Sequence, residues 1–357
     1  MSYLHKTHNR FIRFLGLITI AVFGMLSTLG TGGSDGDGDG VPPVTYTGLR
    51  TPAAITSDNA LLFGEIAFLG LSASTTITPI AVQSVPPAET RNASVITITR
   101  VLHAVVNDIN VNSAINSIPM GWVETQPPIS GDCSSGTASG SIDVNESTQM
   151  FSGSLVFNNF CDFGITMDGT VDIVGTCDPN TFNVNTQTCD IIAYTLTFNT
   201  LNVSGYGVSE TMDGTISSVI TSPTDYQTTL NILLRDDNDN MTYWFENYVI
   251  TVTYDLNTGY DNVVVTGNVY HPAYGFVVIS TLTPVEFNHD MLDSPPLSGV
   301  ARLTGGIPTG ADPMTSALTT ATFRFIDFNN FEIDLDTDGV VGTDRTLSCA
   351  WDTGICF

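Results

Sequence analysis

The fold is decided by one stretch, residues 157–173, which reads Phe157-Asn-Asn-Phe-Cys-Asp-Phe-Gly-Ile-Thr-Met-Asp-Gly-Thr-Val-Asp-Ile173. Its second half contains Thr166-Met-Asp-Gly-Thr170, which returns as Thr211-Met-Asp-Gly-Thr215. Its first half has the form Phe-x-Asn-aromatic and returns at residues 245–248 and 328–331, with a degraded copy at residues 198–201. An Asp-Gly pair between alternating residues is a strong hairpin signal, and self-similarity along a chain marks one supersecondary unit used several times. The stretch therefore predicts a repeated β-hairpin.

The sequence after Gly140 has a period of two residues. Apolar residues alternate with polar ones, and the runs are separated by Asp-Gly, Asn-Thr-Gly or Asp-Asn turns. These runs predict a mainly β fold in which a long antiparallel hairpin meander forms a curved sheet or half-barrel with one buried face. The apolar residues 58–69 predict a short buried helix that covers this face, and residues 100–109 fit either a second helix or a strand. A β-sandwich is the alternative architecture.

The composition bounds the class of protein. The 357 residues allow one large all-β domain or two smaller ones, and 42% hydrophobic with only 13% charged residues excludes a disordered acidic chain. Because 36 acidic residues face 10 basic ones, we expect no nucleic-acid partner and no docking to anionic lipid headgroups. Divalent cations or cationic partners suit this charge. Acidity that only keeps a β protein soluble is the simpler explanation.

The N-terminus has the three parts of an export signal. A basic segment precedes the apolar run Phe14–Leu29, and small residues follow the run. The run has 16 residues, fewer than the ~20 that a spanning helix needs, so we expect cleavage near Gly30, with a retained anchor as the alternative. The predicted location is the periplasm, the outer-membrane surface or the extracellular space.

The expected organisation has five parts. They are a signal peptide (1–30), a flexible acidic linker (31–45), an N-terminal helix-containing segment (46–130), a repeated β-hairpin region (131–293) and a C-terminal β segment with an acidic turn (294–357). Six cysteines lie in the exported part, which favours disulfides in an oxidising compartment. Pairing by proximity joins Cys133 to Cys161, Cys177 to Cys189 and Cys349 to Cys356, although sequence alone leaves other connectivities open.

Acidic residues near the C-terminus predict a metal site. Asp334, Asp336 and Asp338, followed by a glycine, match the first half of a calcium loop, where alternate oxygens surround the ion. The second half does not match, because Arg345 stands at its last position and the nearest carboxylate, Asp344, comes one residue earlier. Calcium is therefore the one cofactor we consider, and an acidic turn at a strand end is the alternative.

Aromatic residues predict a ligand site. Trp244, Tyr248, Tyr270 and Tyr274 lie beside asparagines and His271, and aromatic faces with neighbouring amides are suited to sugars. Cross-strand aromatic pairs also simply stabilise sheets, which is the competing interpretation. The sequence has no Gly-x-Ser-x-Gly elbow and no phosphate-cradling glycine loop, so we assign no catalytic residue.

Further motifs follow one another along the exported chain. They are Tyr46-Thr-Gly48, Pro52-Ala-Ala-Ile-Thr56, Phe157-Asn-Asn-Phe160 with the Asp-Gly-Thr motifs, Tyr243-Trp244, His271-Pro-Ala-Tyr-Gly-Phe-Val277, and a final Asp-x-Asp-x-Asp-Gly strand with Trp351. In this order the chain resembles a recurring group of uncharacterised proteobacterial extracytoplasmic β-repeat proteins, usually lipoproteins. The resemblance implies an exported β-rich protein and carries over no catalytic residue. The chain departs from that group because it lacks the cysteine that would carry a lipid, which leaves membrane tethering open.

Three functions fit these observations. The leading expectation is an exported structural or binding protein of the bacterial cell envelope, with an envelope protein, glycan or lipid as partner. A periplasmic carrier of hydrophobic ligands is the second, by analogy with half-barrels wrapped on helices. A polysaccharide-binding or polysaccharide-active protein is the third. An apolar cavity would favour the carrier, and an exposed aromatic groove with two close carboxylates would favour the third.

Overall fold

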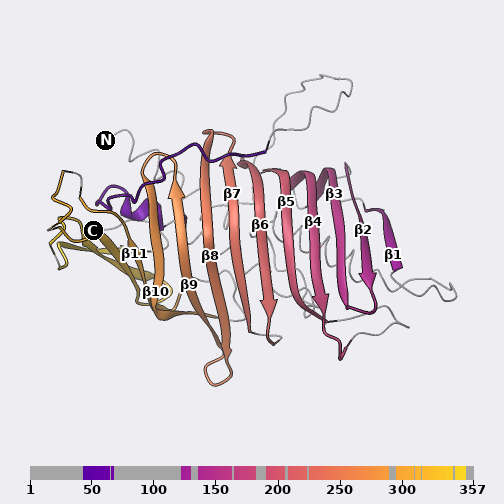
Figure 1. Ribbon diagram of the computed structural model, residues 1–357. Helices are drawn as coiled ribbons and strands as arrows, with labels where there is room; N and C mark the ends of the chain where they lie inside the picture. Colours follow the sequence, from indigo (N-terminus) through magenta and orange to yellow (C-terminus); the bar gives the residue numbers. More distant parts are fainter. Residues whose placement is uncertain are drawn as a thin grey trace, which may run out of the picture.

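A computed structural model describes residues 43–64, 66–67, 122–129, 136–162, 165–181, 190–205, 208–222, 225–288, 295–308, 310–314, 316–340 and 342–350. Within these residues, 14 strands form one sheet whose spatial order is the order along the chain. Each strand pairs antiparallel with the next. Figure 1 shows β1 to β10 side by side in one broad layer, with β11 and later strands turned away at one end.

The strands have the following bounds: β1 Trp122–Ile129, β2 Thr137–Asn145, β3 Met150–Asp162, β4 Ile165–Cys177, β5 Ile191–Gly205, β6 Val208–Ile220, β7 Tyr226–Asp236, β8 Met241–Asp255, β9 Tyr260–His271, β10 Gly275–Asn288, β11 Ser298–Thr304, β12 Thr320–Phe325, β13 Asn330–Asp336 and β14 Arg345–Ala350. The predicted mainly β meander with a short N-terminal helix is thereby confirmed. The described part contains a single sheet, so the β-sandwich alternative is not adopted.

One short helix is described at residues 60–64 and 66–67, inside the predicted range 58–69. The candidate at residues 100–109 lies outside the described residues. No helix among the described residues combines the length and the apolar character that crossing a membrane requires.

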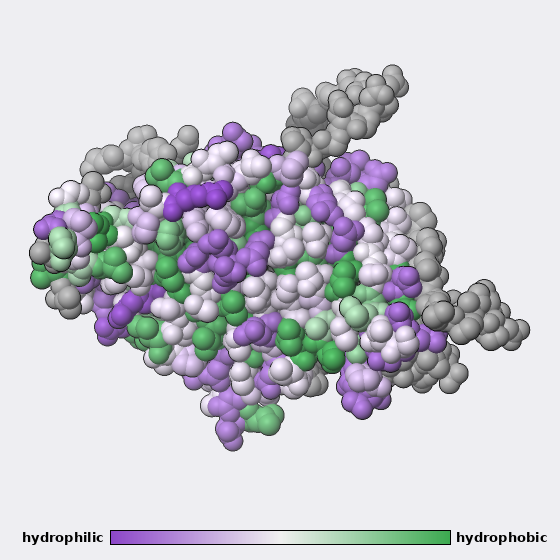
Figure 2. Space-filling view, viewed as in Figure 1, coloured by the Kyte–Doolittle hydropathy of each residue, from purple (hydrophilic) through white to green (hydrophobic). Residues whose placement is uncertain are grey.

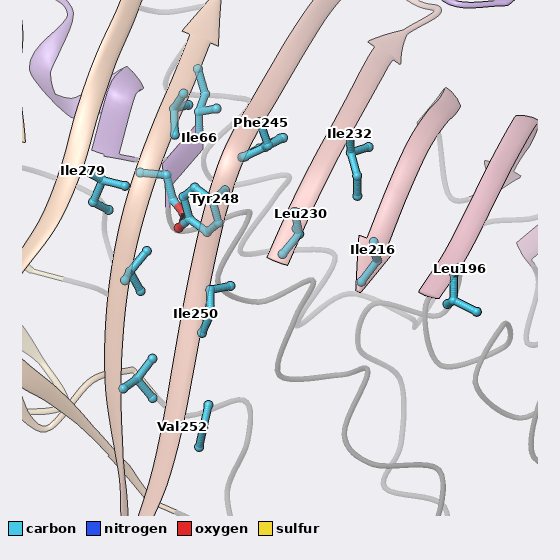
Figure 3. Packing of buried hydrophobic residues seen from close by; sticks show 14 of the residues in the cluster. Ile66, Leu196, Ile216, Leu230, Ile232, Phe245, Tyr248, Ile250, Val252 and Ile279 are labelled. Carbon is cyan, nitrogen blue, oxygen red and sulfur yellow. Dashed lines mark hydrogen bonds between the residues drawn. The ribbon is translucent and has the colours of Figure 1, made fainter. Parts of the chain in front are cut away.

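Buried side chains gather on one face of the sheet, called here the inner face. On β7, buried and less buried residues alternate along the strand, as a strand with one covered face requires. Figure 3 shows Leu196, Ile216, Leu230 and Tyr248, which come from β5 to β8 and belong to one apolar cluster. Burying each side chain of this size stabilises the fold by ~1.5–3 kcal/mol. The opposite side of the sheet is called the outer face.

The helix packs against the inner face near β8 to β12. The ring of Phe63 is fully buried and lies 6.2 Å from the ring of His271. A side chain at Gly64 would come within 2.5 Å of the Phe323 ring, so glycine allows the helix to approach this ring closely. The hydroxyl of Tyr248 donates a hydrogen bond to the carbonyl of Ala67, which fixes the helix over β8.

Three copies of the Phe-x-Asn-aromatic motif form β-bulges inside strands. In β3, the pairing passes from Phe157–Gly169 to Phe160–Met167, so two residues face one. Equivalent shifts follow Phe198 in β5 and Phe245 in β8. Register pairs connect the second and third bulges through β6 and β7, and a bulge bends its strand and increases the local twist. The repeat therefore builds a line of bends across the sheet.

The two Asp-Gly pairs of the repeat also lie inside strands, so their predicted role as hairpin turns is wrong. Gly169 is in β4 with a φ of 134°, and Gly214 is in β6 with a φ of 117°. A Cβ on Gly169 would lie 2.8 Å from the carbonyl oxygen of Thr200, and one on Gly214 would lie 2.2 Å from that of Asn231. Glycine is used here because the neighbouring backbone comes too close for a side chain.

Side chains opposite the bulges hold the extra residue in place. Asn159 and Asn247 have φ values of 46° and 48°, in the left-handed region that asparagine tolerates better than most residues. The N–H of Asn159 donates to Oδ1 of Asp168 at 3.1 Å, and the N–H of Asn247 donates to Oδ1 of Asn231 at 2.8 Å. The aspartate that precedes Gly169 thus accepts the backbone hydrogen bond that the bulge removes from the ladder.

Other turn signals are confirmed. The Asp-Asn run ends β7 and joins it to β8, and the Asn-Thr-Gly run joins β8 to β9. In the second turn the carboxylate of Asp255 accepts hydrogen bonds from the backbone and side chain of Asn257, and the backbone bond is the main cause that lowers the Asp255 pKa. The fourth copy of the repeat, residues 328–331, spans the end of the turn between β12 and β13 and the start of β13, and Asp327 in this turn accepts the N–H groups of Asn329 and Asn330.

Residues 43–56, called here the N-terminal strap, connect the outer face to the helix. The N–H of Val44 donates to Oδ2 of Asp213 on β6, and the N–H of Leu49 donates to the carbonyl of Pro272 after β9. Figure 1 shows the strap crossing the ends of β6 to β10 before it reaches the helix. The strap thus joins strands that are distant from it in sequence.

Candidate functional site

Two of the four predicted ligand-binding aromatics form a stack on the outer face. Trp244 on β8 and Tyr270 on β9 are direct cross-strand partners, and their ring centroids are 4.4 Å apart with an interplanar angle of 23°. Phe276 on β10 continues the cluster, 5.0 Å from the Tyr270 ring.

The N-terminal strap covers this stack. The ring of Tyr46 packs 5.7 Å from Trp244 and 5.6 Å from Tyr270, and its hydroxyl donates to the carbonyl of Leu49. The guanidinium of Arg50 lies 5.2 Å from the centroid of the Trp244 ring and 5.9 Å from that of Tyr46, within the range of cation–π attraction. The chain therefore places its own side chains where a ligand would stack.

Glu246 provides the polar edge of the cluster. Its Oε2 accepts hydrogen bonds from the Tyr270 hydroxyl at 2.7 Å and from Asn268 at 2.9 Å. Burial, followed by the hydrogen bond to Glu246, raises the pKa of Tyr270 to about 12. Burial also raises the pKa of Tyr46 to about 12, against the opposing effect of Arg50. Both phenols therefore stay protonated across the physiological pH range.

The other two predicted aromatics lie elsewhere. Tyr248 is fully buried on the inner face, and burial raises its pKa far above the ordinary value. Tyr274 is in the turn between β9 and β10, 41% exposed, with its ring 4.7 Å from that of His271. His271 itself is buried, accepts the N–H of Ala273 on Nδ1, and has its pKa lowered to about 4 by burial. The four aromatics thus do not form one surface.

Part of the predicted metal loop comes together at the end of β13. Asp336, Asp338 and Asp344 each offer one carboxylate oxygen, and these three oxygens lie within 4.8 Å of one another. Asp334 is not part of this group, because its carboxylate pairs with Arg324 on β12 at 2.5 Å and accepts the hydroxyl of Thr346 on β14 at 2.7 Å. The structure therefore brings together two of the three predicted residues, Asp336 and Asp338, with Asp344 in the place expected for Asp334.

Several carboxylate oxygens of the loop also accept backbone hydrogen bonds. Oδ2 of Asp344 accepts the N–H groups of Thr337 and Asp338, Oδ1 of Asp338 accepts that of Val340, and Oδ2 of Asp336 accepts that of Gly342. Oδ1 of Asp336 is buried and has no hydrogen-bond donor among the described residues. A buried oxygen without a donor, beside two further carboxylates, fits a hard cation such as calcium, which takes only oxygen ligands.

The negatively charged carboxylates of the loop repel one another. Burial raises the pKa of Asp336, and the nearby charges of Asp344 and Asp338 raise it further. Hydrogen bonds from the Thr337 backbone lower the pKa of Asp344. A divalent cation would relieve the repulsion within this group, so its binding would lower the pKa of Asp336.

A further acidic group was not foreseen from the sequence. Glu210 on β6 faces Asp236 on β7, and Asp237 follows in the turn. Burial, together with the charges of Asp236 and Asp237, raises the pKa of Glu210 to about 7. Arg235 pairs with Asp237 at 2.6 Å, which orients that carboxylate. Only the pairing of β6 with β7 brings residues 210 and 236 together, and nothing in the local sequence indicates it.

The described cysteines are Cys161, Cys177 and Cys349, and all three are buried and disulfide-bonded. No cysteine in the described part is free. The partners expected from sequence, Cys133, Cys189 and Cys356, lie outside the described residues. The pairing itself therefore stays a prediction.

No family model, no curated protein and no solved structure gives a significant match to this chain.

Proposed function

We propose that the protein is an exported structural or binding protein of the bacterial cell envelope, which uses the outer face of its sheet. The observation that carries this proposal is a row of short polar side chains across six neighbouring strands. Paired residue by residue from β2 to β7, the row consists of Ser141, Ser154, Asp172, Thr197, Thr215 and Asn231. Such a row offers four hydroxyl groups, one carboxylate and one amide in a regular array.

The chemistry of this face suits a polar partner of low negative charge. Thr195 and Ser217 in the next row share a hydrogen bond of 2.9 Å, and Asn199 donates to Asp172 at 2.7 Å. Figure 2 shows pale residues, with scattered apolar and hydrophilic ones, over the strands. A surface rich in hydroxyls and amides forms many directed hydrogen bonds, each of modest net strength. The affinity for a partner would therefore depend on the contact area and on the regular spacing of these polar groups.

Three further observations support export. Three buried cysteines are disulfide-bonded, and structural disulfides persist in oxidising compartments. The N-terminal signal pattern and the resemblance to extracytoplasmic β-repeat proteins point to the same location. The proposed compartment is the envelope or the space beyond it.

Expression of the full chain in a Gram-negative bacterium tests the location. We expect the protein in the exported fraction, shortened by its signal and resistant to thiol alkylation until it is reduced. A cytoplasmic protein that retains residues 1–30 and six reactive thiols would contradict the proposal.

A charge placed in the polar row tests the surface. We expect Thr197→Lys together with Thr215→Lys to abolish sedimentation of the purified protein with isolated envelope fragments. Asn257→Lys, in the exposed turn between β8 and β9, adds the same kind of charge away from the row and should leave sedimentation unchanged. Equal loss in both variants, or none in either, would show that the outer face is not used.

A carrier of hydrophobic ligands is the second candidate, because the apolar inner face extends across the sheet. Buried apolar residues run from Ile142 on β2 to Leu347 on β14, whereas the described helix packs near β8 to β12. A native mass spectrum of the protein from its exported fraction separates the two functions. Added mass in the range of a lipid would favour the carrier, and a bare polypeptide mass would favour the structural or binding role.

A further inference from the structure

Residues 51–55 of the N-terminal strap occupy a slot between β10 and the segment that follows β11. On one side, the N–H of Ala53 donates to the carbonyl of Phe276 at 2.7 Å, and the N–H of Phe276 donates to that of Thr51 at 3.0 Å. On the other side, the N–H of Gly306 donates to the carbonyl of Ala53 at 2.7 Å. The strap is therefore bonded along both edges, like a short strand added to a sheet.

The slot is shaped for a bare extended backbone. A Cβ on Gly275 would lie 2.1 Å from the carbonyl oxygen of Thr51, and one on Gly305 would lie 2.1 Å from that of Ala53. Beyond the slot, the hydroxyl of Thr319 accepts the N–H of Ile55 at 2.8 Å and donates to the carbonyl of Gly306. The side chain of Ala53 is buried, so the occupant needs a small residue at this position.

The strap and the slot are far apart along the chain. The contacts of Ala53 and Ile55 are with residues more than 200 positions away in sequence. On the C-terminal side, 54 residues separate residue 67 from the start of β1 at residue 122. The effective concentration of a tethered segment falls as its linker lengthens, so a strap from a second copy competes better across a long connection than across a short one.

We propose that the slot also accepts residues 51–55 of a second copy of this chain, which bring the helix that follows them, so that copies are linked by exchange of their N-terminal straps and helices. The incoming strap makes the same backbone hydrogen bonds and meets the same glycines as the resident one. Exchange of an identical element is a low-cost route to association, because each copy forms with its partner the same interactions that it would otherwise form within itself. Reciprocal exchange gives a dimer, and one-way exchange gives a linear chain. This inference rests on the proposed structural role and deepens it.

Two complementary variants of the mature full-length chain test the exchange. Ala53→Asp puts a carboxylate on a buried side chain, so its strap is defective while its slot is intact. Gly305→Ala puts a Cβ into the slot without any left-handed φ, so its slot is blocked while its strap is intact. The two proteins, one of them isotope-labelled, are unfolded in urea with disulfides intact, mixed, diluted and examined by native mass spectrometry.

We expect a mixed-label dimer in the mixture, at least tenfold more abundant than any dimer in either variant alone. Ala54→Ser alters a half-exposed strap residue and serves as the matched control. Mixed with Gly305→Ala, it should give no more mixed-label dimer than the wild-type protein gives. If a variant does not fold by itself, recovery of its far-ultraviolet circular dichroism in the mixture gives the second readout. Monomers only, without recovery of structure, would overturn the exchange.

The result separates this inference from the proposed function. Failed complementation together with normal export and normal sedimentation with envelope fragments would remove strap exchange and leave the binding role. A cytoplasmic, reduced protein that still forms the mixed dimer would remove the envelope role and leave strap exchange.

Discussion

Thr200 occupies, at the second bulge, the position that asparagine occupies at the other two. Its φ is 56°, in the left-handed region where a β-branched residue is strained. Asn159 and Asn247 adopt the same conformation at lower cost, because asparagine is several-fold enriched there. The copy at residues 198–201 therefore lacks asparagine at the one position whose left-handed φ favours it.

We predict that Thr200→Asn raises the free energy of unfolding by roughly 0.5–1 kcal/mol, since it removes part of a strain of ~1–3 kcal/mol. The reciprocal change, Asn159→Thr, should lower it by a similar amount. Urea unfolding followed by tryptophan fluorescence measures both. If both changes shifted the midpoint in the same direction, the left-handed conformation would not be the cause.

Glu210 gives a second prediction at the residue scale. Its pKa is about 7 in the folded protein against 4.5 for a free glutamate, so between these pH values the folded state binds more protons than the unfolded state. By linkage, the free energy of unfolding then falls as pH rises through this window. Glu210→Gln, neutral at every pH, should be more stable than wild type at pH 8 by about 1–3 kcal/mol and equally stable near pH 4.

The comparison uses urea unfolding of both proteins from pH 4 to pH 8. His271, whose lowered pKa works in the opposite sense because it destabilises the fold as pH falls, is present in both proteins and cancels. Asp236→Asn removes a neighbouring charge and should lower the Glu210 pKa. The free energy of unfolding should then fall over a narrower pH range. A constant difference between wild type and Glu210→Gln at all pH values would refute the assigned cause.

At the scale of the element, the line of bulges depends on glycines that let neighbouring backbones approach. We predict that Gly214→Ala lowers the free energy of unfolding by more than the ~1–3 kcal/mol of backbone strain alone, because its Cβ would meet the Asn231 carbonyl oxygen at 2.2 Å. Gly310→Ala is the matched control, with a φ of 82° and open space around the Cβ. Thermal unfolding compares the two. Equal losses would show that strain acts alone and that the close approach is unimportant.

The same glycines explain what sequence reasoning could and could not predict about the strands. Alternation and the Asp-Asn and Asn-Thr-Gly turns predicted an antiparallel meander correctly, because period two and turn chemistry are local properties. Asp168-Gly169 was misread as a turn, since glycine serves positive φ values and close approach alike. The better signal was the Phe-x-x-Phe spacing of residues 157 and 160, which places two buried residues three apart and breaks the period of two.

The bulge in β8 also explains the aromatic residues. With a strict period of two, Trp244 and Tyr248 would share a face, which is what the sequence suggested. The extra residue at Asn247 moves Tyr248 to the inner face and leaves Trp244 on the outer face under the strap. Likewise, the ion pair of Asp334 with Arg324 depends on the pairing of β12 with β13, and local sequence does not reveal it.

At the scale of the whole molecule, charge dominates the solution behaviour. The chain has a formal net charge of −26, and like charges distributed over one folded unit repel one another. Salt screens this repulsion, with a Debye length of ~10 Å at 0.1 M ionic strength. Any cation should therefore stabilise the fold to some extent, and a specific site must be recognised by what it adds beyond screening.

Calcium bound at the loop of Asp336, Asp338 and Asp344 should stabilise the fold by more than ionic screening alone does. We predict that ~10 mM CaCl2 raises the free energy of unfolding above that in NaCl of equal ionic strength by about 1.4–2.7 kcal/mol, the linkage expected for a site of ~10⁻³–10⁻⁴ M affinity. Asp344→Asn should abolish the excess, because it removes one of the three clustered carboxylates. Asp334→Asn, outside the cluster, should keep the excess while losing the contact with Arg324. Thermal unfolding of the three proteins in both salts measures this. Coinciding wild-type curves at matched ionic strength would show that the loop is only an acidic turn and that its effect is screening alone.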